Sequence, residues 1–171
     1  LFPSELIHIG GDECPKVRWE KCPRCQARIR QLGLRDKDGY TAEHYLQGYV
    51  TDRIGKYLAE RGRRIIGWDE ILEGQAPSDA IVMSWRGSAG GIKAAKLGHD
   101  VIMTPNSHFY FDYYQSPDAD AEPFGIGGCV TIDKVYSFDP MADLTPEQLA
   151  HILGVQANLW PEYIASADHL V

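Results

Sequence analysis

Short runs of consecutive apolar residues recur along the chain and predict the strands of a sheet. Each run is four to six residues long, is rich in Ile and Val, and does not alternate between apolar and polar positions. A strand that is covered on both faces has this pattern, which is typical of parallel sheets. We therefore predict strands at Leu6–Ile9, Arg64–Trp68, Ala80–Trp85, Asp100–Thr104 and Ile152–Ala157.

Helical patterns lie between most of these runs. Thr41–Arg61 is the clearest one, because apolar residues recur along it at helical spacing and a glycine follows it as a stop signal. Further helices are expected at Trp19–Leu32, at Ala89–Leu97 and from the capping box Thr145–Gln148 onward. The longest helix should carry one apolar stripe, formed by Tyr45, Leu46, Tyr49, Val50, Ile54, Tyr57 and Leu58.

The alternation of strands and helices, without return hairpins, predicts βα units and a parallel α/β sheet. Functional side chains at the carboxyl ends of successive strands are the habit of a (β/α)8 barrel. A dinucleotide-binding turn needs a glycine spacing that Gly10–Glu13 lacks. Because a complete barrel has eight strands, we predict a partial (β/α)8 TIM barrel. The polar or aromatic residues after the strands include Asp12-Glu13, Trp68-Asp69-Glu70, Trp85-Arg86 and Asn158.

Composition narrows the classes of function. Of the 171 residues, 44% are apolar and 24% are charged, and 17 Lys and Arg against 24 Asp and Glu give a net charge of −7. An acidic chain has no surplus of cations for phosphates or anionic lipids, so we expect neither nucleic acid nor membrane as a partner. The chain begins at Leu1 and shows no signal peptide, and we expect it to be an internal piece of a larger protein.

The strongest chemical signal is the segment His8–Glu13, with the sequence His-Ile-Gly-Gly-Asp-Glu. An apolar strand leads into two glycines, which permit a tight backbone, and then into the adjacent carboxylates Asp12 and Glu13. Two neighbouring acids in a loop are often a solvated pair or a helix cap, and that interpretation stays open. Paired carboxylates with aromatic residues nearby fit glycoside hydrolysis.

His8–Glu13 resembles the signature of glycoside hydrolase family 20, the β-N-acetylhexosaminidases. Four later segments are similar to motifs of that family, occur in the same order and extend the resemblance over nearly the whole chain. The resemblance implies that residues 1–171 are the C-terminal portion of the TIM-barrel catalytic domain, about strands 4 to 8, with the first strands missing. The four segments are Gly67–Glu70, Ser84–Gly87, Tyr110–Asp112 and Gln156–Glu162.

The resemblance further implies a retaining enzyme that hydrolyses terminal non-reducing GlcNAc or GalNAc. The substrate's own 2-acetamido oxygen would attack the anomeric carbon and give an oxazolinium intermediate. Glu13 would act as general acid and then as base, which favours a site drier than bulk water or close to another negative charge. Asp12 would orient the acetamido N–H, and Tyr110 would donate a hydrogen bond to the acetamide oxygen.

The other implied site residues bind the sugar. Trp68, Trp85 and Trp160 would form walls, and Asp112 and Glu162 would accept hydrogen bonds from ring hydroxyls. From the residue types alone, Asp69 and Glu70 are expected to support the site, Arg86 to pair with an acid or lie in solvent, and His8 to be a supporting or a core residue. The resemblance implies N-acetylhexosamine glycans as partners, no cofactor and no catalytic metal, and export to the periplasm or the outside.

Two features depart from the family pattern. Its substrate-binding Arg belongs to the first barrel strand, which we expect to be absent here. Its further Trp, from the loop after the seventh strand, has no counterpart in residues 113–151. We expect the leaving-group side to be open or to use an aromatic residue among Tyr113, Tyr114, Phe124 and Tyr136.

The four cysteines and the fragmentary barrel leave alternatives open. Cys22 and Cys25 have C-x-x-C spacing, with Cys14 shortly before them and Cys129 far away. Free thiols or one disulfide are the favoured interpretations, and a zinc-stabilised module is the rival. A second rival is an inactive glycan-binding barrel fragment, because an unclosed barrel leaves exposed strand edges.

Overall fold

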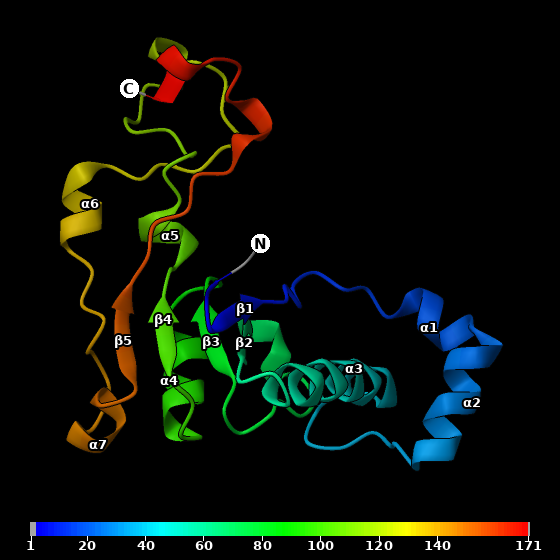
Figure 1. Ribbon diagram of the computed structural model, residues 1–171. Helices are drawn as coiled ribbons and strands as arrows, with labels where there is room; N and C mark the ends of the chain where they lie inside the picture. The colour runs from blue at the N-terminus through cyan, green and yellow to red at the C-terminus, as the bar shows by residue number, and fades with distance from the viewer. Residues whose placement is uncertain (1–2, 171) are drawn as a thin grey trace.

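Five parallel strands form one sheet, and their order in space is their order in the sequence (Figure 1). The computed structural model describes residues 3–170. Each connection adds the next strand on the same side, which is the winding of a (β/α)8 barrel and not of a doubly wound sheet. All five predicted strands are confirmed, with bounds within two residues of the prediction: β1 (Leu6–His8), β2 (Arg64–Trp68), β3 (Ile81–Ser84), β4 (Val101–Met103) and β5 (Ile152–Val155).

The single helix predicted at Trp19–Leu32 is two helices, α1 (Val17–Lys21) and α2 (Pro23–Leu32). Cys22 separates them with an extended backbone, at ψ 115°. The cause is Pro23, because the residue before a proline avoids the helical conformation and proline itself suits the first position of a helix. In Figure 1 these two helices project away from the sheet.

The other predicted helices are present as α3 (Ala42–Ala59), α4 (Ala89–Lys96) and α7 (Pro146–Leu149). Sequence reasoning missed α5 (Asn106–Phe109) and α6 (Ile132–Tyr136), which are too short to show a helical period. Four 3₁₀ turns complete the described elements: η1 (Asp69–Leu72), η2 (Ala119–Ala121), η3 (Pro161–Tyr163) and η4 (Ala167–Leu170). No helix among the described residues has the length and apolarity to cross a bilayer.

The apolar stripe predicted for α3 lies only in part on the face that packs against the rest of the fold. Leu46 is buried and Leu58 packs against the core. Val50, Ile54 and Tyr57 are 44%, 37% and 57% exposed, whereas small residues of α3 are buried. A Cβ at Gly48 would lie 2.7 Å from the backbone N of Gln75, and one at Gly55 would lie 2.9 Å from Pro77. The helix approaches this loop so closely that only glycine fits, and hydrophobicity alone gives no sign of that.

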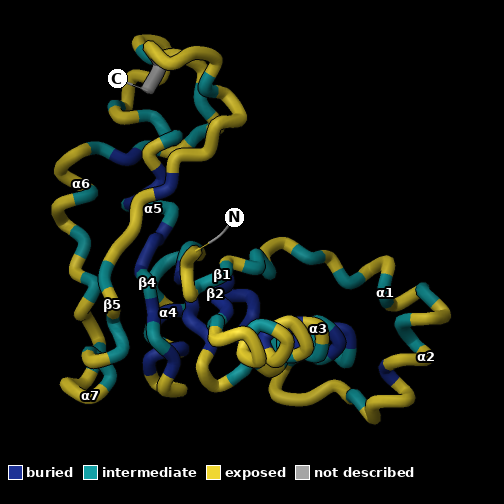
Figure 2. Tube along the Cα trace, in the orientation of Figure 1, coloured by how far each residue is buried: buried dark blue, intermediate teal, exposed yellow. Residues whose placement is uncertain are grey.

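The central strands β2 and β3 are buried and carry apolar side chains on both faces, as the uninterrupted runs predicted, whereas β5 at the edge is partly exposed (Figure 2). One face packs Ile65, Val82 and Val101 against α4 and η1. The opposite face carries Ile66 and Met83 next to the site described below. In a barrel the second face is the interior, where side chains of the strands fill the centre.

Candidate active site

A pocket of about 290 Å³ lies at the carboxyl edge of the sheet. It contains every one of the eight residues that the sequence assigned to catalysis or sugar binding, from all five strand ends. Sequence reasoning did not assign Ile126 to the site, and it named Tyr113 only as a possible contact to the leaving group. The residues that line the pocket are Asp12, Glu13, Trp68, Trp85, Tyr110, Asp112, Tyr113, Ile126, Trp160 and Glu162.

The loop after β1 presents the two adjacent carboxylates through a backbone that requires glycine. Gly10 and Gly11 have φ of 71° and 105°, and a Cβ at Gly11 would lie 2.7 Å from Ile71. Glu13 itself has φ 44°, in the left-handed region where a non-glycine residue costs about 1–3 kcal/mol. Asp12 and Glu13 are exposed, so the described residues do not supply the dry surroundings expected for Glu13.

Three indoles and one phenol form the walls of the pocket. The ring centroids of Trp68 and Trp160 are 6.0 Å apart, and those of Tyr110 and Trp160 are 6.1 Å apart, both pairs at steep angles. Trp85 lies almost parallel to Tyr110, at 16° and 6.2 Å. Trp68 and Tyr110 are buried, whereas Trp160 is 37% exposed at the rim. Rings in this arrangement offer apolar faces to one sugar or its acetamido group.

Tyr110 is buried and is held in place through Asn158. Its burial raises the pKa of the phenol to about 12, so the hydroxyl stays protonated at neutral pH. Asn158 holds the backbone on both sides of it: Phe111 N donates to the Asn158 carbonyl at 2.8 Å, and Asn158 N donates to the Phe109 carbonyl at 2.7 Å. The side-chain amide of Asn158 is fixed in turn by a hydrogen bond to buried Thr104 Oγ1, at 2.9 Å.

Trp85 is held by a network of acids centred on Arg86. Glu70 accepts the indole N–H of Trp85 at 3.0 Å, and Asp69 accepts the backbone N–H groups of Trp85 and Arg86. The Arg86 guanidinium lies 2.6 Å from Asp69 and 2.7 Å from Glu73. Burial raises the pKa of Glu70. The contacts confirm that Asp69 and Glu70 support the site and that Arg86 pairs with acids.

Asp69→Asn is expected to lower the free energy of unfolding by about 2–4 kcal/mol, because it removes a buried charge that Arg86 and two backbone N–H groups share. Asp52→Asn is the matched control. It removes a pair of similar length, 2.7 Å to Lys56, but the Asp52 side chain is 37% exposed where that of Asp69 is 2% exposed. The control should cost less than about 1 kcal/mol. Urea unfolding of the full-length gene product measures both, and equal losses would contradict the network.

Asp112 and Glu162 lie at the outer rim of the pocket. Asp112 is half-buried, and its Oδ1 accepts the backbone N–H of Trp160 at 3.3 Å, which ties the two sides of the rim together. This hydrogen bond uses Oδ1 of Asp112 and does not involve Oδ2. Glu162 is exposed and lines the pocket from η3.

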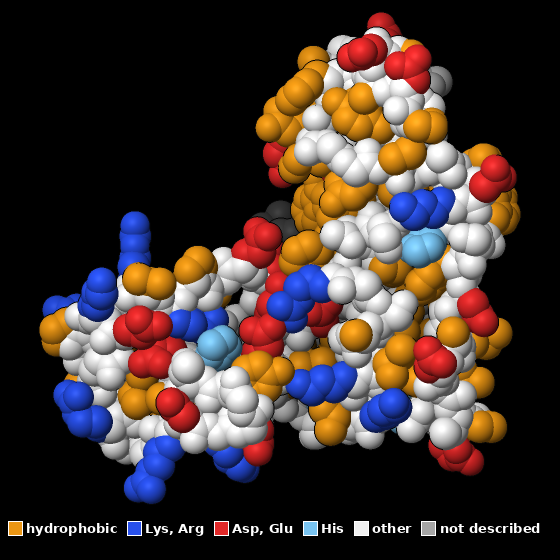
Figure 3. Space-filling view, turned by 180° about the vertical axis from the view of Figure 1, so that it is seen from behind, with side chains coloured by type: hydrophobic (Ala, Val, Ile, Leu, Met, Phe, Trp, Pro, Cys, Tyr) orange, Lys and Arg blue, Asp and Glu red, His pale blue; other side chains and the backbone are white. Residues whose placement is uncertain are grey.

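The aromatic residues expected on the leaving-group side lie in different places. Tyr113 lines the pocket itself. Tyr114 and Phe124 line a neighbouring pocket of about 520 Å³, which shares Asp112, Tyr113, Ile126 and Trp160 with the first. Tyr136 is 84% exposed on α6 and lines neither. The neighbouring pocket belongs to the upper part of the molecule, and Figure 3 shows hydrophobic side chains gathered there.

The cysteines do not form the disulfide considered above. Cys14, Cys22, Cys25 and Cys129 are all free thiols. Among the side chains that the structure describes, residues 3–168, no three His, Cys, Asp or Glu are placed to hold a metal ion together. His8, the other undecided residue, packs its ring edge on Trp68 at 4.9 Å and accepts the Gly10 N–H at Nδ1. It therefore supports one wall of the pocket and the loop after β1 that carries Asp12 and Glu13, called the carboxylate loop below (residues 10–16).

Comparisons with known proteins agree with this geometry. The model of the glycosyl hydrolase family 20 catalytic domain matches residues 1–171. A β-hexosaminidase of Porphyromonas gingivalis is 49% identical over 98% of this chain and 21% of its own length. One of Vibrio furnissii is 33% identical over 99% of this chain and 27% of its own length.

Solved structures extend the comparison to the fold. The exo β-N-acetylglucosaminidase of Vibrio harveyi in complex with N-acetylglucosamine superimposes with a TM-score of 0.82 and 30% identity, over 99% of this chain and 26% of that one. Such neighbours are TIM-barrel enzymes, so the predicted partial barrel is confirmed. The chain spans about a quarter of the length of these relatives.

Proposed function

Because this chain belongs to glycosyl hydrolase family 20, we propose that the protein carrying it is a retaining β-N-acetylhexosaminidase. It removes terminal non-reducing GlcNAc or GalNAc by substrate-assisted catalysis. The observation that carries the proposal is the meeting of two adjacent carboxylates and a protonated phenol in one indole-walled pocket. At about 290 Å³, the pocket is at the small end of ligand sites and suits one sugar unit better than a chain.

Glu13 protonates the glycosidic oxygen as the leaving group departs and later takes a proton from the attacking water. Its place in the lining of the pocket, next to Asp12 and opposite the aromatic walls, supports this role. The left-handed backbone at Glu13 is strain of the kind that gathers at functional sites.

The acetamido arm of the substrate is the nucleophile in this proposal, and two residues hold it. Asp12 accepts its N–H and offsets the positive charge that grows on the forming oxazolinium ring. Tyr110 donates to the acetamide oxygen and aims it at the anomeric carbon. The position of Tyr110 in the pocket wall, between Trp85 and Trp160, supports that assignment.

The remaining site residues bind the sugar. Trp68, Trp85 and Trp160 enclose the acetamido methyl and the apolar ring face. Glu162 and the Oδ2 atom of Asp112, which does not bond Trp160, accept hydrogen bonds from the ring hydroxyls. As part of the same proposal, residues 1–171 are the C-terminal portion of the catalytic barrel, and the protein is periplasmic or secreted, as the family resemblance implies.

The test compares substrates with and without the acetamido group, using the full-length gene product. We expect hydrolysis of a chromogenic N-acetyl-β-glucosaminide, and a kcat/KM lower by more than about 10²-fold on the matching β-glucoside. A thiazoline mimic of the intermediate should inhibit far more strongly than N-acetylglucosamine. Equal turnover of both substrates would refute the assisted mechanism. Binding of the sugar without turnover would favour the inactive glycan-binding alternative.

A further inference from the structure

A second cavity, of about 390 Å³, lies behind the active site, and Glu13 and Trp85 line both. Its back wall is the N-terminal half of α3, from which His44 and Gln47 reach into it one turn apart. Charged side chains are prominent among the other lining groups, including those of Lys16, Glu73 and Arg86. The proposed mechanism uses neither of the two α3 residues.

Gln47 makes one contact on each side of the carboxylate pair. Its Nε2 donates to the carbonyl of Gly11 at 2.7 Å, directly before Asp12. Its Oε1 accepts from Lys16 Nζ, and the same ammonium donates to the carbonyl of Cys14 at 2.6 Å, directly after Glu13. A single side-chain amide thereby connects the two flanks of the loop to a helix 36 positions away from Gly11 in the sequence.

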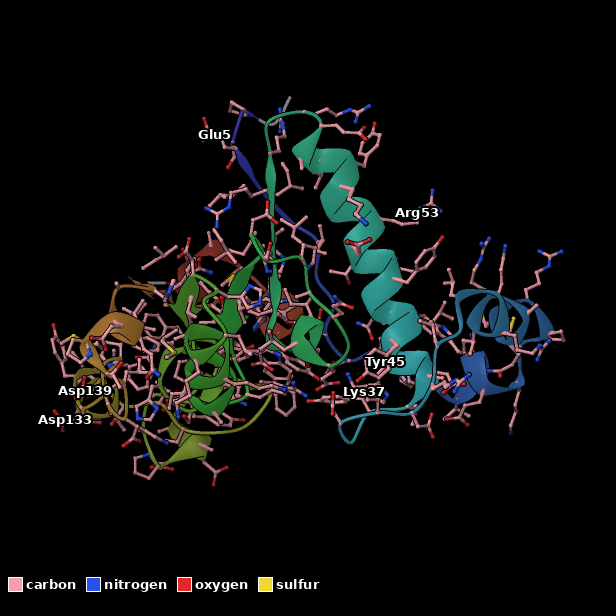
Figure 4. The ribbon with its side chains drawn as sticks, turned by 90° about the horizontal axis from the view of Figure 1, so that it is seen from below. Glu5, Lys37, Tyr45, Arg53, Asp133 and Asp139 are labelled. Atoms are coloured by element: carbon pink, nitrogen blue, oxygen red, sulfur yellow. The ribbon has the colours of Figure 1, made fainter. Side chains whose placement is uncertain are left out.

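The loop needs such a support, because its backbone is strained at Glu13 and its glycines are conformationally free. Glu13 has positive φ, Gly10 and Gly11 restrict the backbone little, and the acids that the loop carries are exposed. By contrast, α3 is firmly seated, with Gly48 and Gly55 packed closely on the loop before β3. At the start of α3, the Tyr45 hydroxyl donates to the Lys37 carbonyl at 3.0 Å, and Figure 4 shows these two residues together while Arg53 points away from the sheet.

We propose that Gln47 is a positioning residue for Asp12 and Glu13, which holds the carboxylate loop against α3 through Gly11 on one side and Lys16 on the other. The inference rests on the proposed function for the roles of the two acids. An uncharged amide meets both contacts at neutral pH, because it donates with nitrogen and accepts with oxygen. A carboxylate at this position accepts from Lys16 but cannot donate to the Gly11 carbonyl.

The consequence for catalysis depends on the leaving group. A loosened loop misplaces the general acid, and a shift of about 1 Å can cost about 10²-fold in rate. With Gln47→Met, we expect kcat/KM on a glycoside with a poor, alkyl leaving group to fall by about 10–100-fold. On the 2,4-dinitrophenyl glycoside, whose first step needs little protonation, kcat/KM should fall by a clearly smaller factor, and the loss that remains reports the misplaced Asp12.

A carboxyl at position 47 supplies a pH readout that a merely structural residue would not give. Gln47→Glu should resemble Gln47→Met at neutral pH, because the carboxylate lacks a donor. Towards acidic pH, its rate relative to wild type should recover, because a protonated carboxyl donates and accepts as the amide does. Gln47→Met should show no such recovery.

Gln26→Met is the matched control. Gln26 also links a carbonyl and a charged side chain, donating to Trp19 O at 3.1 Å and to Glu43 Oε1 at 2.8 Å, but it contacts no part of the carboxylate loop. Its rates should keep the wild-type dependence on the leaving group. Hydrogen–deuterium exchange of the full-length gene product measures the loop directly. In Gln47→Met, the amides of residues 10–16 should exchange about 5-fold faster than in wild type, or more. In Gln26→Met, their exchange rates should equal those of wild type.

The outcomes separate this inference from the proposed function. If wild type hydrolyses no N-acetylhexosaminide, the proposed function fails, and exchange at residues 10–16 alone decides whether Gln47 holds the loop. If wild type is active, no loss of kcat/KM on either leaving group would overturn the positioning role, and equal losses on both would overturn it for Glu13. Exchange that is the same in Gln47→Met and Gln26→Met would overturn the clamp itself.

Discussion

Glu13→Gln is expected to lower kcat by about 10³–10⁴-fold on substrates with poor leaving groups, because general acid–base catalysis contributes up to about 10⁴-fold. The amide cannot give a proton to the glycosidic oxygen and cannot take one from water. Residue 13 has φ 44°, and Gln has the same side-chain length as Glu. Gln should therefore adopt the same conformation, and the pocket should keep its shape. Steady-state kinetics on alkyl and aryl N-acetylglucosaminides measures the loss.

The leaving-group dependence makes this prediction specific. A 2,4-dinitrophenyl glycoside needs little protonation, so Glu13→Gln should spare its first step far more than that of an alkyl glycoside. Glu20→Gln serves as the control, because Glu20 is an exposed acid on α1 and lines none of the pockets described above. Retention of alkyl-glycoside turnover in Glu13→Gln would remove Glu13 from the acid role.

The strands could be predicted because burial on both faces leaves a direct mark on the sequence. Arg64–Trp68 reads as one apolar run, and in the structure Ile65 packs towards the helices while Ile66 packs on the opposite face. The site followed from the strands. Side chains at the carboxyl ends of parallel strands must meet at one edge, so the motif ends predicted which residues share the pocket.

The parts that could not be predicted depend on contacts between distant segments. The packed face of α3 is set by the close approach of Gln75 and Pro77, which no local period of hydrophobicity encodes. Gln47 lies within a helix and has the polarity of a surface residue, yet its amide bonds a loop 36 positions away. Ile126 comes from an irregular loop without a pattern. The break between α1 and α2 at Cys22–Pro23 differs from these features. It was missed, but it could have been predicted, because the proline is a local signal.

Tyr110→Phe is expected to lower kcat/KM on N-acetylglucosaminides by about 10²–10³-fold, the usual cost of losing one positioned donor to a developing charge. The ring should stay where it is. It is buried, stacks at 16° on Trp85 and keeps the Asn158 backbone bonds on either side, so thermal stability should change little. Tyr136→Phe is the control, since that side chain is 84% exposed on α6.

The pH dependence and the substrate dependence of this loss identify what the hydroxyl does. With its pKa held at about 12 by burial, Tyr110 stays protonated, so the ratio of wild-type to variant rates should be constant from about pH 5 to 9. On the β-glucoside without the acetamido group, Tyr110→Phe should cost almost nothing, because the acceptor is already absent and the two removals share one interaction. An equal loss on both substrates would mean that the hydroxyl acts on another part of the sugar.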